Sequence, residues 1–150
     1  EQEQKQSIYT PNIPMPKEHQ EYLYNLCKER GLDFLKVLAV LKHESQFDPN
    51  CITNKDYGYM QINVVNHKDL TQELKTPNKP LDPYINMNWG TYMLSEIYKY
   101  WQDKGLTGDK LDIYVLSTYN KGLNGFKTYG EATGYINKVN EEKKIIDSFF

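Results

Sequence analysis

The sequence has no long hydrophobic run, few cysteines and almost no excess of charge. No stretch approaches the roughly eighteen consecutive apolar residues that a membrane-spanning helix needs. With 18 basic and 20 acidic side chains the net charge is -2, which gives no general attraction to nucleic acid or anionic lipid. Two cysteines among 150 residues exclude a disulfide-dense miniprotein. We therefore expect neither a nucleic-acid partner nor membrane insertion of this chain.

Patterns typical of metal ligands are also scarce. No Cys-x-x-Cys pair occurs, and His19, His43 and His67 lie in separate segments. None of them has a cysteine or carboxylate at ligand spacing on the same helical face. The sequence thus predicts no metal site, and no motif indicates a cofactor.

The composition is that of one ordinary globular domain. Hydrophobic residues make up 39% and charged residues 25% of a chain long enough to bury one core. Tyrosine is abundant, with 13 residues. Its apolar ring and polar tip suit a wet groove for sugars or peptides, but they also suit a tyrosine-rich core. Composition alone leaves both interpretations open.

The N-terminal region differs from the rest of the chain. It begins with Glu1 rather than Met, so we expect a trimmed product in which any leader would be invisible. Residues 1–17 are polar and contain Pro11, Pro14 and Pro16. We interpret them as an extended lead-in or linker, with Ile8 and Tyr9 against a domain formed by residues 18–150.

The remaining pattern predicts a mostly α domain with room for a little β around residues 51–63. Apolar spacing predicts a helix from Lys17 to Gly31, and Asp33 caps a second helix that is apolar almost all round and therefore central and buried. Residues 48–63 read as a loop or small hairpin. Further helices are expected at 64–74 and from Asp82-Pro83 to Gly105. Another is expected over 111–119, with Asp109 as its cap and a break at 120–122. The last helix is expected from about 132 to the C-terminus.

Glu44 is the most informative residue. It ends the buried helix, on the same face as Val37, Val40 and Leu41. A carboxyl group among apolar neighbours loses solvation, which raises its pKa and suits it to general acid catalysis. From helix position alone, the alternative is that Glu44 only marks where the helix reaches solvent. His43 points about 100° away and is not expected to be its partner.

The surrounding motifs favour the catalytic interpretation. The chain contains Glu44-Ser45, then Phe47-Asp48-Pro49, then Gly58-Tyr59-Met60-Gln61. This series resembles the signature of the soluble lytic transglycosylase family, which consists of a Glu-Ser pair, then Phe-x-Pro, then Gly-Leu-Met-Gln. The resemblance covers about residues 18–140 in the family's order. Its further matches are Asp82-Pro83, Asn86, Gly90 and Leu94, then Tyr119-Asn120-Lys121-Gly122, then Glu131, Tyr135 and Val139.

The resemblance implies a goose-type lysozyme fold that cleaves peptidoglycan between N-acetylmuramic acid and N-acetylglucosamine. By this resemblance Glu44 is the single acid/base. It protonates the glycosidic oxygen and then takes the proton of the muramic acid O6, which attacks C1 and leaves a 1,6-anhydro end. The resemblance also implies a set of residues that bind or position the substrate: Ser45, Met60, Gln61, Tyr119, Asn120, Glu131 and Tyr135.

Some positions depart from the family pattern. Tyr59 stands where Leu is usual, Lys121 replaces Ala, and Asp56-Tyr57 replaces small residues. None of these is the acid, so we expect them to alter groove shape. Asp56 is also a possible second carboxylate, which a hydrolase would need, whereas Asp48 reads as a turn residue.

Three functions therefore remain in view. The leading one is a secreted or envelope-exposed lytic transglycosylase that binds glycan strands, as a module compatible with further domains of a larger wall hydrolase. The second is a muramidase of the same fold that uses water and Asp56, and the third is a silent glycan-binding module. An extracytoplasmic location also favours a disulfide between Cys27 and Cys51, although both could pack as free thiols.

Overall fold

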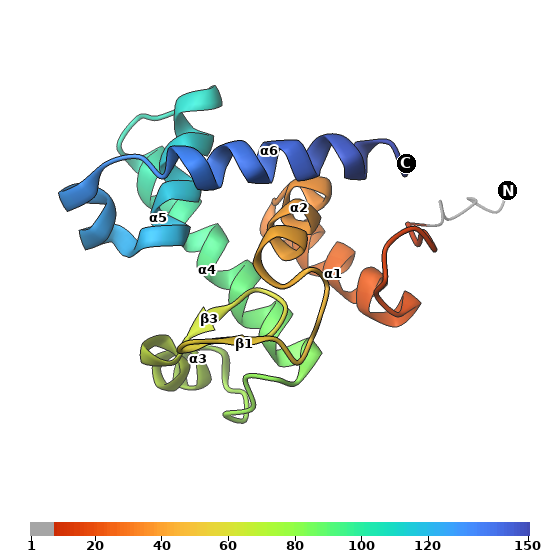
Figure 1. Cartoon of the computed structure of the whole chain (residues 1–150). Helices are drawn as coiled ribbons and strands as arrows, with labels where there is room; N and C mark the ends of the chain where they lie inside the picture. The colour runs from red at the N-terminus through yellow and green to blue at the C-terminus, as the bar shows by residue number, and fades with distance from the viewer. Residues whose placement is uncertain (1–7) are drawn as a thin grey trace, which may run out of the picture.

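The computed structural model describes residues 8–150, and Figure 1 shows how their elements are arranged. Within this part of the chain, six α-helices accompany one small antiparallel sheet. The helices are α1 (Lys17–Arg30), α2 (Phe34–Ser45), α3 (His67–Leu74), α4 (Pro83–Asp103), α5 (Gly108–Tyr129) and α6 (Thr133–Asp147). The expected mostly α, lysozyme-like class is confirmed.

Helix α2 is the centre of the domain, as its apolar sequence predicts. The Asp33 side chain accepts a hydrogen bond from the Lys36 amide and so caps its first turn. Residues 37–41 are all buried. Helix α6 runs across α2 (Figure 1), and this pair has the most extensive contact of any two elements. The Lys42 ammonium lies 2.7 Å from a carboxylate oxygen of Glu142, and this ion pair joins the two helices. The angles of the contact are not those of a hydrogen bond.

The segment before α1 is attached to the domain. Ile13 and Met15 are buried, and the buried side chain of Gln20 bonds to Thr10 through both its amide atoms. The same Gln20 nitrogen reaches the carbonyls of Ile13 and Met15. Residues 8–16 are therefore packed rather than a free linker. The rest of the expected lead-in, residues 1–7, lies outside the described residues.

The sheet is the small hairpin region that the sequence allows between residues 48 and 63. It consists of β1 (Ile52–Thr53), β2 (Asp56–Tyr57) and β3 (Ile62–Asn63), in that order. Asp56 pairs with Asn63 across β2 and β3. A short 3-10 helix, η1 (Val64–Asn66), then leads into α3.

Helix α5 differs from the prediction at both ends. Thr107, not Asp109, is the N-cap residue, and Asp109 lies inside the first turn, where its charge suits the helix dipole. The expected break occurs at Gly122, whose φ of 74° and ψ of 163° are not helical. The helix then resumes and continues to Tyr129, beyond the predicted range of 111–119. Among residues 8–150, no helix has the length and apolar character needed to cross a bilayer.

Candidate active site

A groove of about 600 Å³ opens where α2, α4 and α5 meet the hairpin region. We call its two parts the hairpin side and the helical side. The hairpin side comprises Asp56, Gln61, Ile62, Asn63, Val65 and Asn66. The helical side comprises Glu44, Met93, Ile97 and residues 118–123. The structure thus brings Glu44, Asp56, Gln61, Tyr119 and Asn120 together, as the sequence predicts.

The Glu44 carboxyl lines the groove and has a raised pKa. Burial at the end of α2 and, to a smaller extent, the negative charge of Asp56 together raise the pKa of its carboxyl to about 7. The Tyr135 hydroxyl acts in the other direction and lowers the pKa. A carboxyl group with this pKa is substantially protonated near neutral pH, yet it can also accept a proton.

Two tyrosines stand near the Glu44 carboxyl. The Tyr119 hydroxyl donates a hydrogen bond of 2.6 Å to the Met60 carbonyl, which ties α5 to the loop between β2 and β3. The buried Tyr135 hydroxyl is close enough to influence Glu44 but does not reach full hydrogen-bond geometry with any group in residues 8–150. Burial first, and the Glu44 charge second, raise the pKa of both phenols far above 10, so both remain neutral donors.

His43 lies behind Tyr135 rather than in the groove. Its ring meets the Tyr135 ring edge-on, with 4.9 Å between the centroids. Burial and then the positive charge of Lys138 lower the His43 pKa, against the opposing charge of Glu142. This contact supports the Tyr135 ring next to Glu44.

Met60 holds the loop in place instead of lining the groove. Its side chain is fully buried, so the expectation that it contacts substrate directly is not met. The Asn86 side chain accepts from the Met60 amide at 2.9 Å and donates to the carbonyls of Tyr57 and Pro80. A Cβ at Gly90 would lie 2.2 Å from the Met60 sulfur, so only glycine allows this approach.

The side chains of Gln61 and Ser45 donate their hydrogen bonds to carbonyls within the protein. The Gln61 side chain lines the groove, but its amide nitrogen donates to the carbonyls of Cys51 (3.0 Å) and Gly58 (2.9 Å). Its oxygen is the atom left for a ligand. The Ser45 hydroxyl is buried and donates to the Leu41 carbonyl within α2, so it does not orient the Glu44 carboxyl by donation.

Tyr59, which replaces a usual leucine, lies beneath the same loop. Its ring is fully buried, and its hydroxyl lies 2.7 Å from Nδ1 of His19 in α1. Burial raises the pKa of Tyr59 to about 12 and lowers that of His19. The buried hydroxyl that Tyr59 introduces in place of leucine therefore has a hydrogen-bond partner from another element.

Comparisons with known proteins identify the family of this chain. The family model described as Transglycosylase SLT domain matches residues 23–141. This chain belongs to that family.

Two solved structures show the same fold. One is an inactive mutant of the lytic transglycosylase Slt from Pseudomonas aeruginosa, with 17% identity and a TM-score of 0.63 over 87% of this chain. The other is the 70 kDa soluble lytic transglycosylase from Escherichia coli, with 17% identity and a TM-score of 0.61 over 84%. The chain spans only 22% of the length of each. A comparison with curated proteins finds no match.

Within this SLT domain, Glu131 lies apart from the groove lining. Its side chain is exposed, and its carbonyl accepts from the Lys121 ammonium at 3.4 Å, next to the Gly130 carbonyl at 3.0 Å. Lys121, which departs from the family motif, therefore joins the break in α5 to the turn before α6. Asn120 is exposed in the groove lining and is free to meet a ligand.

Sequence reasoning did not identify Asn63, Val65, Met93, Ile97 and Thr118 as lining residues. Strand alternation could not have pointed from Gln61 to Asn63, because Gln61 lies outside β3 and has a left-handed φ of 51°. Met93 and Ile97 belong to α4, and their half-buried side chains lie where that helix reaches the groove.

The expected disulfide is wrong, because both cysteines are free thiols. Cys27 packs in the core on the inner face of α1, and burial raises its thiol pKa to about 12. Cys51 precedes β1, and its sulfur lies 3.7 Å from the Thr53 hydroxyl. Each thiol therefore has its own local environment.

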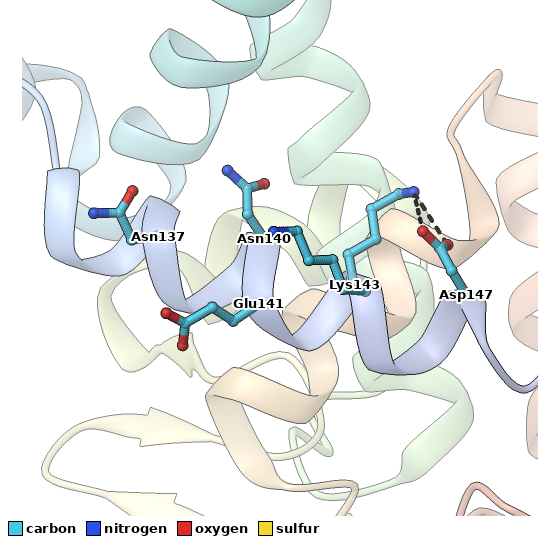
Figure 2. A pocket seen from close by; sticks show the side chains of 6 residues that line it. Asn137, Asn140, Glu141, Lys143 and Asp147 are labelled. Carbon is cyan, nitrogen blue, oxygen red and sulfur yellow. Dashed lines mark hydrogen bonds and ion pairs between the residues drawn. The ribbon is translucent and has the colours of Figure 1, made fainter.

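A second hollow lies on the outer face of α6, and Figure 2 shows its lining. Its polar side chains belong to a single helix, and Lys143 pairs with both carboxylate oxygens of Asp147 at 3.2 Å. The lining of this hollow comes from one helix, whereas several elements of the fold line the groove around Glu44.

Proposed function

We propose that this SLT domain is a lytic transglycosylase that cleaves the β-1,4 bond between N-acetylmuramic acid and N-acetylglucosamine of peptidoglycan. The observation that carries this proposal is the position of Glu44, in an open groove with a pKa raised to about 7. A silent glycan-binding module would have no need of an acid held in this state. Membership of the family supports the substrate class.

The reaction needs one group that first gives and then takes a proton. Protonated Glu44 donates to the glycosidic oxygen as the C1–O bond breaks, which releases the N-acetylglucosamine hydroxyl. The resulting carboxylate then accepts the proton of the muramic acid O6 as this oxygen bonds to C1. The product has a 1,6-anhydro end, and Glu44 is protonated again.

The surrounding residues position the sugar in this proposal. Tyr119 and Asn120 meet it from the helical side and the Gln61 oxygen from the hairpin side. Tyr135 stays behind Glu44 and steadies its carboxyl. Peptidoglycan as substrate implies an extracytoplasmic site of action, and the larger size of the similar structures is consistent with further domains.

Digestion of purified peptidoglycan followed by mass spectrometry tests this proposal. Wild-type protein should release fragments with anhydro ends. Glu44→Gln should lower the rate roughly a thousandfold, because the amide keeps the shape but cannot transfer the proton. Glu141→Gln, an identical change on the exposed face of α6, should retain full activity. Near-normal turnover by a folded Glu44→Gln variant would refute the assignment.

A further inference from the structure

The hairpin side of the groove contains a second carboxylate that the transglycosylase reaction does not use. Asp56 is half-buried in β2 and lines the same groove as Glu44. Glu44 and Asp56 are the only acidic residues in that lining. Asp48, the other acidic residue near Glu44 in sequence, is exposed and accepts from the Asn50 amide as a turn residue.

The orientation of Asp56 is fixed by its partner across the sheet. Asn63 pairs with it in the β2–β3 register, and the Asn63 amide nitrogen donates to Oδ1 of Asp56 at 3.1 Å. The Asn63 oxygen is itself engaged, because it accepts from the Val65 amide at 3.1 Å. Both ends of the Asn63 amide are therefore satisfied, which prevents the side chain from turning over.

This arrangement leaves one oxygen of Asp56 available. Within residues 8–150, no lysine, arginine or histidine forms an ion pair with Asp56, and its Oδ2 makes no hydrogen bond. Its charge acts on both Glu44 and Tyr119, so the carboxylate lies near the catalytic group. An unneutralised carboxylate with a free oxygen is the kind of group that can accept a proton from water.

We propose that Asp56, oriented by Asn63, delivers a water molecule to the anomeric carbon, so that this site also hydrolyses the glycosidic bond. The inference rests on the proposed function, since it assumes the same substrate and the same acid, and it adds a second acceptor for the glycosyl group. Glycosidases that use water place a second carboxyl group near the acid in this way.

Each atom in the hydrolytic step is accounted for. The Glu44 proton passes to the glycosidic oxygen as its bond to C1 breaks. The water oxygen bonds to C1 and gives one proton to Asp56, and the sugar retains the other on its new hydroxyl. The proton on Asp56 then returns through solvent to Glu44. The product has a reducing end and differs from the anhydro product by one water.

The two products allow Asp56 to be tested within one digestion. Wild-type protein acting on purified peptidoglycan should give both reducing and anhydro ends by mass spectrometry. Asp56→Asn should lower the rate of reducing-end formation by roughly a hundredfold. The same variant should still form anhydro ends, which shows that it is folded and that Glu44 remains competent.

Two further variants separate the carboxylate from its support. Asn63→Leu keeps the Asp56 carboxylate but removes its donor, so the share of reducing ends should fall less than in Asp56→Asn. Asp109→Asn, an exposed change in the first turn of α5, should leave the product ratio unchanged.

The outcomes are distinguishable from those of the proposed function. Anhydro ends alone from wild-type protein would overturn this inference and leave the transglycosylase intact. An unchanged product ratio in Asp56→Asn would overturn the role of Asp56. Reducing ends alone, still dependent on Asp56, would support the inference and overturn the transglycosylase. Release of neither product by wild-type protein would overturn both proposals.

Discussion

The helical side and the hairpin side of the groove are held in place by different kinds of interaction. Glu44 is positioned by α2, whose Val37, Val40 and Leu41 are buried in the core. The strands of the hairpin region are two residues long and too short to be stable alone. They are positioned by side chains that bond to their backbone, chiefly Asn86.

This difference has a consequence for how each side tolerates change. Apolar burial is spread over many contacts, so no single polar group decides where Glu44 lies. The hairpin side depends on a few buried hydrogen bonds, and a lost partner leaves the others unsatisfied. Single polar substitutions should therefore disturb the hairpin side more than the helical side.

The largest expected effect on stability is that of Asn86→Ala. It leaves the Met60 amide and the carbonyls of Tyr57 and Pro80 without their partner in a buried site. We expect the free energy of unfolding to fall by about 3 kcal/mol, which thermal unfolding would record as a lower Tm. Asn137→Ala, on the exposed face of α6, is the matched control and should change it by less than about 0.5 kcal/mol. Equal effects of both variants would refute the role of Asn86 in holding the hairpin side.

The second prediction concerns the helical side and pH. Burial raises the pKa of Glu44 from 4.5 to about 7, so between these values the folded protein holds a proton that the unfolded chain has released. The free energy of unfolding should therefore fall as pH rises through this window, by a total of about 3 kcal/mol. Glu44→Gln cannot ionise and escapes this loss.

Denaturant unfolding at two pH values measures this effect. At pH ~8 the Glu44→Gln variant should be more stable than wild-type protein by about 3 kcal/mol, and at pH ~4 the two should be equal. Glu141→Gln, whose carboxyl is exposed, should follow wild-type protein at both. A Glu44→Gln variant that tracks wild-type stability across the whole range would show that the Glu44 carboxyl is not desolvated.

The same contrast explains how much the sequence could predict. On the helical side, signals lie close together in the chain: the cap at Asp33, the apolar period of α2 and the place of Glu44 on it were all predicted. Asp109 was wrongly chosen as a cap, because the helix already begins at Gly108 with Thr107 as its N-cap residue.

The hairpin side could be predicted only in outline. Asn86 reaches Met60 from 26 residues away, and no local pattern reports such a contact. The family motif identified Met60 as important, but only the structure shows that its backbone, not its side chain, matters for the groove. Asp56 was noted as a carboxylate, whereas its partner Asn63 became evident from strand register.

The smallest expected effect comes from the two cysteines, one in the helical core and one beside the hairpin. Because both are free, reducing agent should leave the thermal stability unchanged, and unfolded protein should contain two titratable thiols without reduction. In the folded protein, the half-exposed Cys51 should react with a thiol reagent first. Cys27 should react only on unfolding, because it is 1% exposed and its pKa of about 12 leaves almost no thiolate. A Cys27 that reacts as fast as Cys51 would mean that α1 opens readily, and would place the less stable region in the helical core instead of the hairpin.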